Sequence, residues 1–156
     1  MKGPAGLGLL LLLAVGCGGG GDGGAGATIS SQPLAGKIGG QAWTFTTGET
    51  SDALSTSEQL WVDLYADTFD ACVAFGAPPN ADLVTMMMPR TPGSYTVSLT
   101  LNATIYSAST STNFVATRGL LVIDSVTATT ISGGLNITYN GDNTVNGQFQ
   151  AAICPP

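Results

Sequence analysis

The stretch LNITYNGDNTVNGQFQAAI, residues 135–153, decides the fold. In its first half the apolar residues Leu135, Ile137 and Tyr139 alternate with polar ones, and an alternation of period two is typical of a half-buried β-strand. After NGDN the apolar positions resume at Val145, Phe149, Ala151 and Ile153. Asn-Gly and its neighbours tolerate the positive φ that a tight connection needs. The stretch therefore predicts a β-hairpin.

The same alternation recurs upstream of the hairpin, over 59–65 and 94–101, and predicts two more half-buried strands. Further strands are expected over 37–45 (with a kink at Gly39-Gly40), 72–75, 83–88, 103–107, 113–116 and 120–127. Turn signals at 77–80, 89–93 and 132–134 separate them. No amphipathic helix stands out, and residues 50–60 have room for one helical turn.

Short strands with turn signals between them indicate an antiparallel sandwich or barrel. Of the two we expect the sandwich. The predicted fold is all-β: a single antiparallel β-sandwich, immunoglobulin-like or jelly-roll-like, with about eight or nine short strands.

The charge composition limits the classes of function. Charged residues make up 9% of the chain, whereas about 25% is typical of a soluble domain. Ten acidic residues against four basic ones give a net charge of −6, which disfavours nucleic acid and anionic lipid as direct partners. The chain has no histidine, the commonest general base and metal ligand, and no nucleophile elbow, phosphate loop or zinc-binding spacing. We therefore expect no enzymatic activity and no cofactor.

The N-terminal residues contain a short apolar stretch, within LGLLLLLAVGCGGGGDGG at 7–24. It is shorter than the about 20 residues that a membrane-spanning helix needs. A lone Lys2 before it and small residues after it follow the order of a secretory signal. Ala14-Val15-Gly16 would suit an ordinary cleavage site, so one interpretation is an ordinary secreted protein.

Residues 13–17, LAVGC, resemble the lipobox of bacterial lipoproteins. The resemblance implies that residues 1–16 are removed as a signal peptide and that Cys17 is acylated, palmitate included, as the first mature residue. Gly18 stands where aspartate would retain such a protein in the inner membrane, so the resemblance implies a lipid anchor in the outer membrane. We expect residues 17–33 to form a glycine-rich flexible tether and residues 34–156 to form the β-sandwich domain.

The body is similar to small envelope lipoproteins of unknown function, in GKIGGQAW at 36–43 and in a last strand that ends in cysteine. We expect a non-enzymatic binding or structural module on the periplasmic face or the cell surface. Its expected partners are the membrane, through the lipid, and a glycan or an envelope protein. The runner-up functions are a secreted carboxylate-dependent hydrolase and a calcium-dependent glycan-binding module.

The three cysteines allow one anchor and one disulfide. If Cys17 carries lipid, Cys72 and Cys154 remain as a pair in an oxidising compartment. The phase of the neighbouring apolar residues puts both off the main core, so we expect the bridge on an outer face or at one end of the sandwich. The alternative is a reactive free thiol, but neither cysteine has a basic neighbour in sequence that would activate it.

Acidic and amide side chains on two loops are weak metal candidates. Asp67 and Asp70 form one group, and Asn140, Asp142 and Asn143 form the other; both offer the oxygen ligands that Ca²⁺ prefers. Neither spacing matches an established calcium loop, and the same residues are common in solvated turns. Asp67 and Asp70 are also the closest acid pair for hydrolytic chemistry.

Two further groups of side chains have a functional and a structural interpretation. Met86-Met87-Met88 could bind Cu(I) through thioether sulfur, but a strand would turn Met87 away from the other two, which favours core filling. Four aromatic residues could form a sugar-stacking platform, although large aromatics in a small β-domain mostly fill the core. These are Trp43, Trp61, Tyr65 and Tyr106.

Overall fold

The computed structural model describes residues 27–73 and 76–156, and this part of the chain forms eleven strands. They are β1 (Ala35–Ile38), β2 (Gln41–Thr44), β3 (Thr47–Ser51), β4 (Gln59–Tyr65), β5 (Leu83–Pro89), β6 (Gly93–Val97), β7 (Ala103–Ser107), β8 (Thr112–Ala116), β9 (Gly119–Val126), β10 (Thr130–Asn140) and β11 (Asn143–Ala152). One 3₁₀ turn, η1 (Asp52–Leu54), separates β3 from β4. The prediction of an all-β fold is confirmed.

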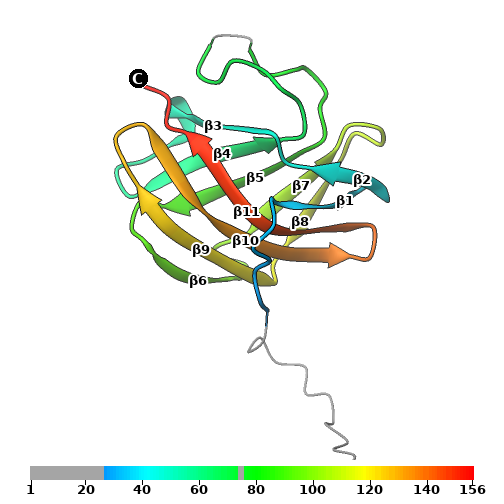
Figure 1. Cartoon of the computed structure of the whole chain (residues 1–156). Coiled ribbons are helices and arrows are strands. Elements are labelled where there is room, and N and C mark those ends of the chain that lie inside the picture. The colour runs from blue at the N-terminus through cyan, green and yellow to red at the C-terminus, as the bar shows by residue number, and fades with distance from the viewer. Residues whose placement is uncertain (1–26, 74–75) are drawn as a thin grey trace, which may run out of the picture.

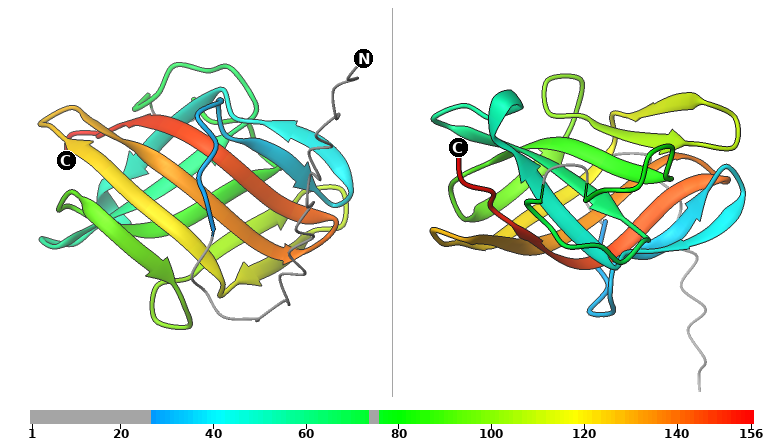
Figure 2. Two further views of the ribbon diagram at one scale, coloured as in Figure 1. Left: turned by 60° about the horizontal axis from the view of Figure 1, so that its bottom comes forward. Right: turned by 90° about the horizontal axis from the view of Figure 1, so that it is seen from above.

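The strands form one continuous sheet that curls round on itself (Figures 1 and 2). Its order is β6-β9-β10-β11-β3-β4-β5-β7-β8, with β1 paired to β11 and β2 paired to β1. The strands pair antiparallel except β11 with β3, where Ala152 pairs with Glu49 in parallel; an isolated parallel bridge also joins Pro33 to Gln148. β8 also contacts β10, so the sheet is nearly closed into a barrel.

The expected two-layer sandwich is therefore replaced by a mixed, nearly closed barrel. The parallel contact between β11 and β3 joins two halves that a sandwich would keep as separate sheets. Glycine permits the close approach of β11 to the N-terminal segment, because a Cβ on Gly147 (φ +149°) would lie 2.6 Å from the carbonyl oxygens of Gln32 and Pro33. Between Ser132 and Gly133 the register of β10 against β9 shifts, and such bulges bend a sheet.

The predicted hairpin at 135–153 is the longest pair of strands, β10 and β11. Its alternation holds in space, because Leu135, Ile137, Val145 and Phe149 are buried in the core. Tyr139 departs from it with 52% of its surface exposed, packed against Phe114 at 5.3 Å between ring centroids. The remaining core comes mostly from alternate residues of β4, β5, β7 and β9, such as Val62 on β4.

Three strand predictions were wrong in their extent. Strand β6 ends at Val97, and Leu99 is 82% exposed in a turn that the backbone hydrogen bond from Ser98 to Leu101 closes. Residues 37–45 form two strands, because Gly39 and Gly40 both have positive φ and reverse the chain.

The predicted strand over 72–75 starts in a turn instead, where Cys72 has φ +66°; residues 74 and 75 lie outside the described residues. Residues 83–88, 103–107, 113–116 and 120–127 correspond to strands within one residue at each end. The helical turn expected within 50–60 is η1.

The described chain begins on the outer face of β10 and β11 (Figures 1 and 2). Amide side chains hold it there: Asn136 Nδ2 donates to Thr28 O at 2.8 Å, Asn146 Oδ1 accepts from Ser30 N at 2.9 Å, and Gln148 Nε2 donates to Ser30 O at 2.9 Å. Contacts of the folded body thus extend upstream of residue 34. The predicted signal peptide at 1–16, and Cys17, lie outside the described residues.

No helix among the described residues is long and apolar enough to cross a membrane.

The disulfide between Cys72 and Cys154 is present, with 5.1 Å between the Cα atoms. It ties the residues just after β11 to the long connection between β4 and β5. Cys72 is exposed and Cys154 is half-buried, so the bridge lies off the core, as predicted.

Candidate functional site

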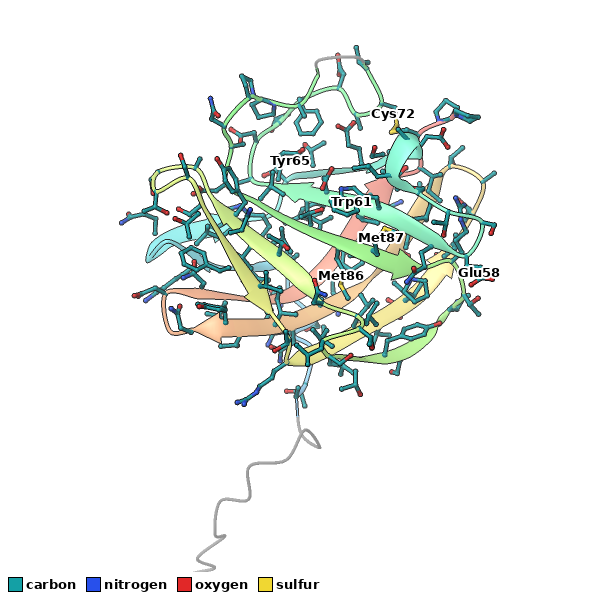
Figure 3. The ribbon with its side chains drawn as sticks, turned by 180° about the vertical axis from the view of Figure 1, so that it is seen from behind. Glu58, Trp61, Tyr65, Cys72, Met86 and Met87 are labelled. Atoms are coloured by element: carbon teal, nitrogen blue, oxygen red, sulfur yellow. A yellow bond between two sulfur atoms is a disulfide. The ribbon has the colours of Figure 1, made fainter. Side chains whose placement is uncertain are left out.

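The outward side of β4, β5 and β7 carries a cleft, and the alternation of β4 explains its composition. Leu60, Val62 and Leu64 point into the barrel and are buried. Trp61 and Asp63 therefore point outward, and Figure 3 shows Trp61 on this side next to Met87 of β5. The two are direct partners across the strands.

The cleft has a volume of about 180 Å³ and combines one large aromatic with amide and hydroxyl groups. Its floor comes from the three strands, and residues 100–102, in the connection between β6 and β7, form one wall. The lining residues are Gln59, Trp61, Thr85, Met86, Met87, Thr100, Leu101, Asn102 and Thr104.

Hydrogen bonds fix the orientation of the aromatic residue. Trp61 Nε1 donates to Asp63 Oδ1 at 3.0 Å. Across the strands Asp63 faces Thr85, and Thr85 faces Thr104. Thr85 Oγ1 is buried beside the carboxyl group of Asp63; it falls outside strict hydrogen-bonding geometry but lies near enough to favour the ionised form of that carboxyl group. A buried hydroxyl needs a hydrogen-bond acceptor, and the Asp63 carboxyl group is the one placed next to it.

The carboxylates next to the cleft repel each other. Asp63 lies directly opposite Glu49 on β3. Burial raises the pKa of Asp63 above its usual value, and repulsion from Glu49 adds to this; the nearby hydroxyl of Thr85 and the indole N–H of Trp61 oppose it. Burial also raises the pKa of Tyr65 to about 12, with a further contribution from the charge of Asp63.

The four aromatic candidates separate into core and surface. Trp43 is buried, with its Nε1 donating to Asp82 O at 3.2 Å. Tyr65 is 8% exposed and packs edge-on against Phe69, with 5.1 Å between ring centroids. Trp61 and Tyr106 are half-buried, and of the four only Trp61 lines the cleft.

The oxygen-rich turn of the hairpin is held by its own hydrogen bonds. Asn140 Oδ1 accepts from Asp142 N at 3.1 Å and from Asn143 Nδ2 at 3.0 Å. Asn143 Oδ1 accepts from Gly39 N at 2.9 Å. These side-chain oxygens thus stabilise the turn and its contact with the β1–β2 turn. This is the structural role predicted from the sequence as the alternative to a calcium site.

The other candidate metal ligands predicted from the sequence do not come together at one site. Asp67 and Asp70 are exposed in the connection after β4, and neither belongs to a group of three or more side chains near enough to share a metal ion in the described part of the chain. Met86 and Met88 are buried, whereas Met87 points outward. The three methionines therefore do not face one another.

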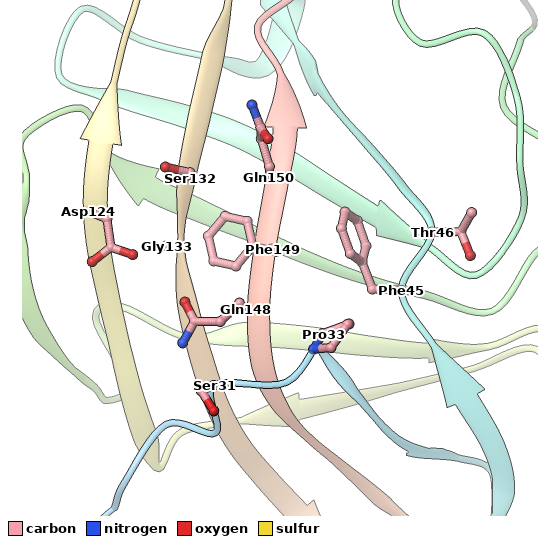
Figure 4. Close-up of a pocket in the computed structure, with 10 residues that line it drawn as sticks. All are labelled: Ser31, Pro33, Phe45, Thr46, Asp124, Ser132, Gly133, Gln148, Phe149 and Gln150. Carbon is pink, nitrogen blue, oxygen red and sulfur yellow. The ribbon is translucent and has the colours of Figure 1, made fainter.

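A second, wider depression of about 540 Å³ lies on the opposite outer face, over β9, β10 and β11 (Figure 4). Phe45, Phe149 and Pro33 give it an apolar floor, and Asp124 and Gln148 lie at its sides. The N-terminal segment at 31–33 forms part of its wall, so this depression belongs to the face that the chain covers with its own residues.

Sequence reasoning missed a second group of reactive side chains. Glu49 Oε2 accepts a hydrogen bond from Cys72 N at 2.7 Å, beside the disulfide. Glu49 is 23 residues from Cys72, and the register of β3 against β4 and β11 brings them together. No local sequence signal marks this contact.

No family model matches the chain, and no curated protein or solved structure is significantly similar to it.

Proposed function

We propose that this protein is a lipid-anchored bacterial envelope protein, non-enzymatic, that binds a neutral glycan in the cleft around Trp61. The observation that supports the proposal is the composition of the cleft. One outward tryptophan is surrounded by uncharged amide and hydroxyl groups, those of Gln59, Asn102 and Thr104 among them.

The chemistry of the lining selects the ligand class. A sugar ring offers C–H groups that pack on an aromatic face and hydroxyl groups that exchange hydrogen bonds with amides and hydroxyls. No described lining residue is charged, so no side chain in the cleft would neutralise the charge of a charged ligand. Its volume of about 180 Å³ is below the roughly 300–1,000 Å³ of sites for drug-sized ligands, which fits one ring of a longer chain.

The anchor is proposed from the lipobox resemblance, with lipid on Cys17. The described chain begins on the β10–β11 face, and the cleft opens on the far side of the barrel (Figures 1 and 3). The segment that leads to the proposed anchor therefore begins away from the cleft, so attachment through Cys17 does not require the cleft to be covered.

The geometry does not favour the runner-up hydrolase at this cleft. Hydrolysis by carboxylates needs two acids facing one substrate. The described lining residues include no carboxylate, and the side chain of Asp63 is bonded to Trp61.

The test is a binding titration with neutral oligosaccharides of the cell envelope. Trp61→Ala should weaken binding at least about tenfold, because the stacking face and its buried area are lost together. Tyr106→Ala is the matched control, since Tyr106 is half-buried on the same outward side but does not line the cleft. Equal loss in both variants, or binding that Trp61→Ala leaves intact, would contradict the proposal.

A further inference from the structure

Glu49 and the disulfide form a compact group where the two halves of the barrel meet. The Glu49 carboxylate oxygen and the sulfur atoms of Cys72 and Cys154 lie within 4.8 Å of one another. Glu49 and Cys154 are half-buried, whereas Cys72 is exposed, so the group can be reached from solvent. None of the three residues lines the Trp61 cleft, although Glu49 faces Asp63 across the strands.

Contacts other than the sulfur–sulfur bond hold both cysteines against β3. Cys72 N donates to Glu49 Oε2 at 2.7 Å, and Cys154 N donates to Thr50 Oγ1 at 2.9 Å. The pairing of Ala152 with Glu49 fixes the strand just before Cys154. Neither bond involves a sulfur atom, so breaking the disulfide does not itself remove them. Reduction thus leaves two thiols beside one carboxylate.

We propose that Glu49, Cys72 and Cys154 form a zinc site that the disulfide keeps closed. Two thiolates and a carboxylate are ligands that Zn²⁺ takes, at about 2.3 Å for sulfur and about 2.0–2.2 Å for oxygen. Three protein ligands leave the fourth tetrahedral position to water. The oxidised pair offers no thiolate, so the site opens only on reduction. The net charge of −6 further favours a cation.

Opening the site requires a dithiol reductant. One of its thiolates attacks a disulfide sulfur, and a mixed disulfide forms and is then resolved by the second thiolate. The reductant ends as a disulfide, and two electrons and two protons pass to Cys72 and Cys154. Zn²⁺ then displaces both thiol protons, which are released to solvent. The bound site holds two thiolates, one carboxylate and one Zn²⁺.

The experiment is a calorimetric titration of the mature protein with Zn²⁺. One sample is oxidised, and the other is reduced with a dithiol and freed of it without oxygen. The reduced protein should bind one Zn²⁺ per chain and melt at a higher temperature with zinc than without, because zinc binds the folded state. The oxidised protein should show neither effect.

The ligand role of Glu49 is tested by Glu49→Gln in the reduced state. Replacing it should weaken zinc binding at least about tenfold. Loss of a residue that only supports a metal ligand costs roughly 10–100-fold, so loss of a direct ligand should cost no less. Glu58→Gln removes the same charge at an exposed position and should bind as the parent does. Equal zinc binding by the oxidised protein or by Glu49→Gln would overturn the proposal, as would a reduced chain that binds no zinc or has no cooperative melting transition.

Discussion

The outward faces of β10–β11 and of β4–β5–β7 carry the same kinds of side chain, amides and hydroxyls, but differ in what covers them. On β10–β11, Asn136, Asn146 and Gln148 are bonded to the chain's own N-terminal segment. On the other face, the amide of Gln59 and the hydroxyl of Thr104 line the open cleft beside Trp61.

The difference separates a structural polar surface from one suited to binding. A hydrogen-bonding group that the protein itself satisfies contributes to stability and has little to offer a ligand. Glycine sharpens the contrast, because Gly134 has no side chain and Ile29 packs into the space where a Cβ would lie. The β10–β11 face is thus shaped to receive its own chain, and the β4–β5–β7 face is left open.

The largest expected effect concerns the proposed lipid anchor upstream of the covered face. Cys17→Ser should abolish labelling with palmitate, because the acylated thiol is removed. The body should then be found in the soluble fraction, or remain unprocessed. Labelling with radioactive palmitate followed by fractionation measures both results. A variant that is still labelled would show that the lipobox interpretation is wrong.

The next effect concerns the bridge between the two regions. Reducing the Cys72–Cys154 disulfide should lower the free energy of unfolding by on the order of 4 kcal/mol, since the bridge spans 82 residues. A cooperative transition should remain, because roughly 120 residues can bury a core of their own. Chemical denaturation with and without reductant measures the change. The double variant Cys72→Ser/Cys154→Ser is the control and should not respond to reductant.

A smaller effect tests how closely the covered face fits its own N-terminal segment. Gly147→Ala should destabilise the protein by roughly 2–3 kcal/mol, because the added Cβ meets backbone atoms and the positive φ disfavours a side chain. Gly141→Ala in the hairpin turn is the control, since a Cβ there meets nothing within 4 Å. Urea denaturation compares the two, and equal stability would mean that the segment does not pack on β11 this closely.

The smallest effect comes from the acid beside Trp61. Because burial raises the pKa of Asp63, the folded state holds its proton to higher pH than the unfolded state does. Asp63 therefore costs stability as the pH rises through its unfolded pKa, and the cost is complete above its folded pKa. Asp63→Asn, which keeps an acceptor for the Trp61 indole, should be more stable than the parent at pH 7 by less than about 1 kcal/mol.

The Asp63→Asn difference should shrink toward pH 3, where the parent carboxyl group is neutral as well. Denaturation at both pH values measures it, with Asp52→Asn at an exposed position as the control. A variant less stable than the parent at pH 7 would mean that ionised Asp63 stabilises the fold.

Local alternation made much of the sheet predictable. The phase of Leu60, Val62 and Leu64 already places Trp61 on the opposite side of its strand, and the same logic predicted the hairpin. The alternation predicted a strand that is too long at Leu99, because the apolar pattern continues into a turn. β3 was missed because TGETS has no apolar alternation, and its place follows from its neighbours instead.

Long-range register explains what the sequence could not predict. The closure into a barrel depends on one parallel contact between Ala152 and Glu49, which no local pattern marks. The same contact brings Glu49 beside Cys154, so the candidate zinc ligands were hidden for the same reason. The pairing of Cys72 with Cys154 was predictable without register, because it follows once Cys17 is assigned to the lipid and two cysteines remain.

Mapping of a bound neutral oligosaccharide by NMR tests the contrast between the two faces most directly. The account predicts shifts of the Trp61 indole N–H and of the backbone amides of Thr85 and Asn102 in the cleft. The side-chain amides of Asn136 and Gln148, already bonded to the N-terminal segment, should stay unchanged. Shifts confined to the β10–β11 face, or none at Trp61 with any neutral envelope glycan at millimolar concentration, would contradict it.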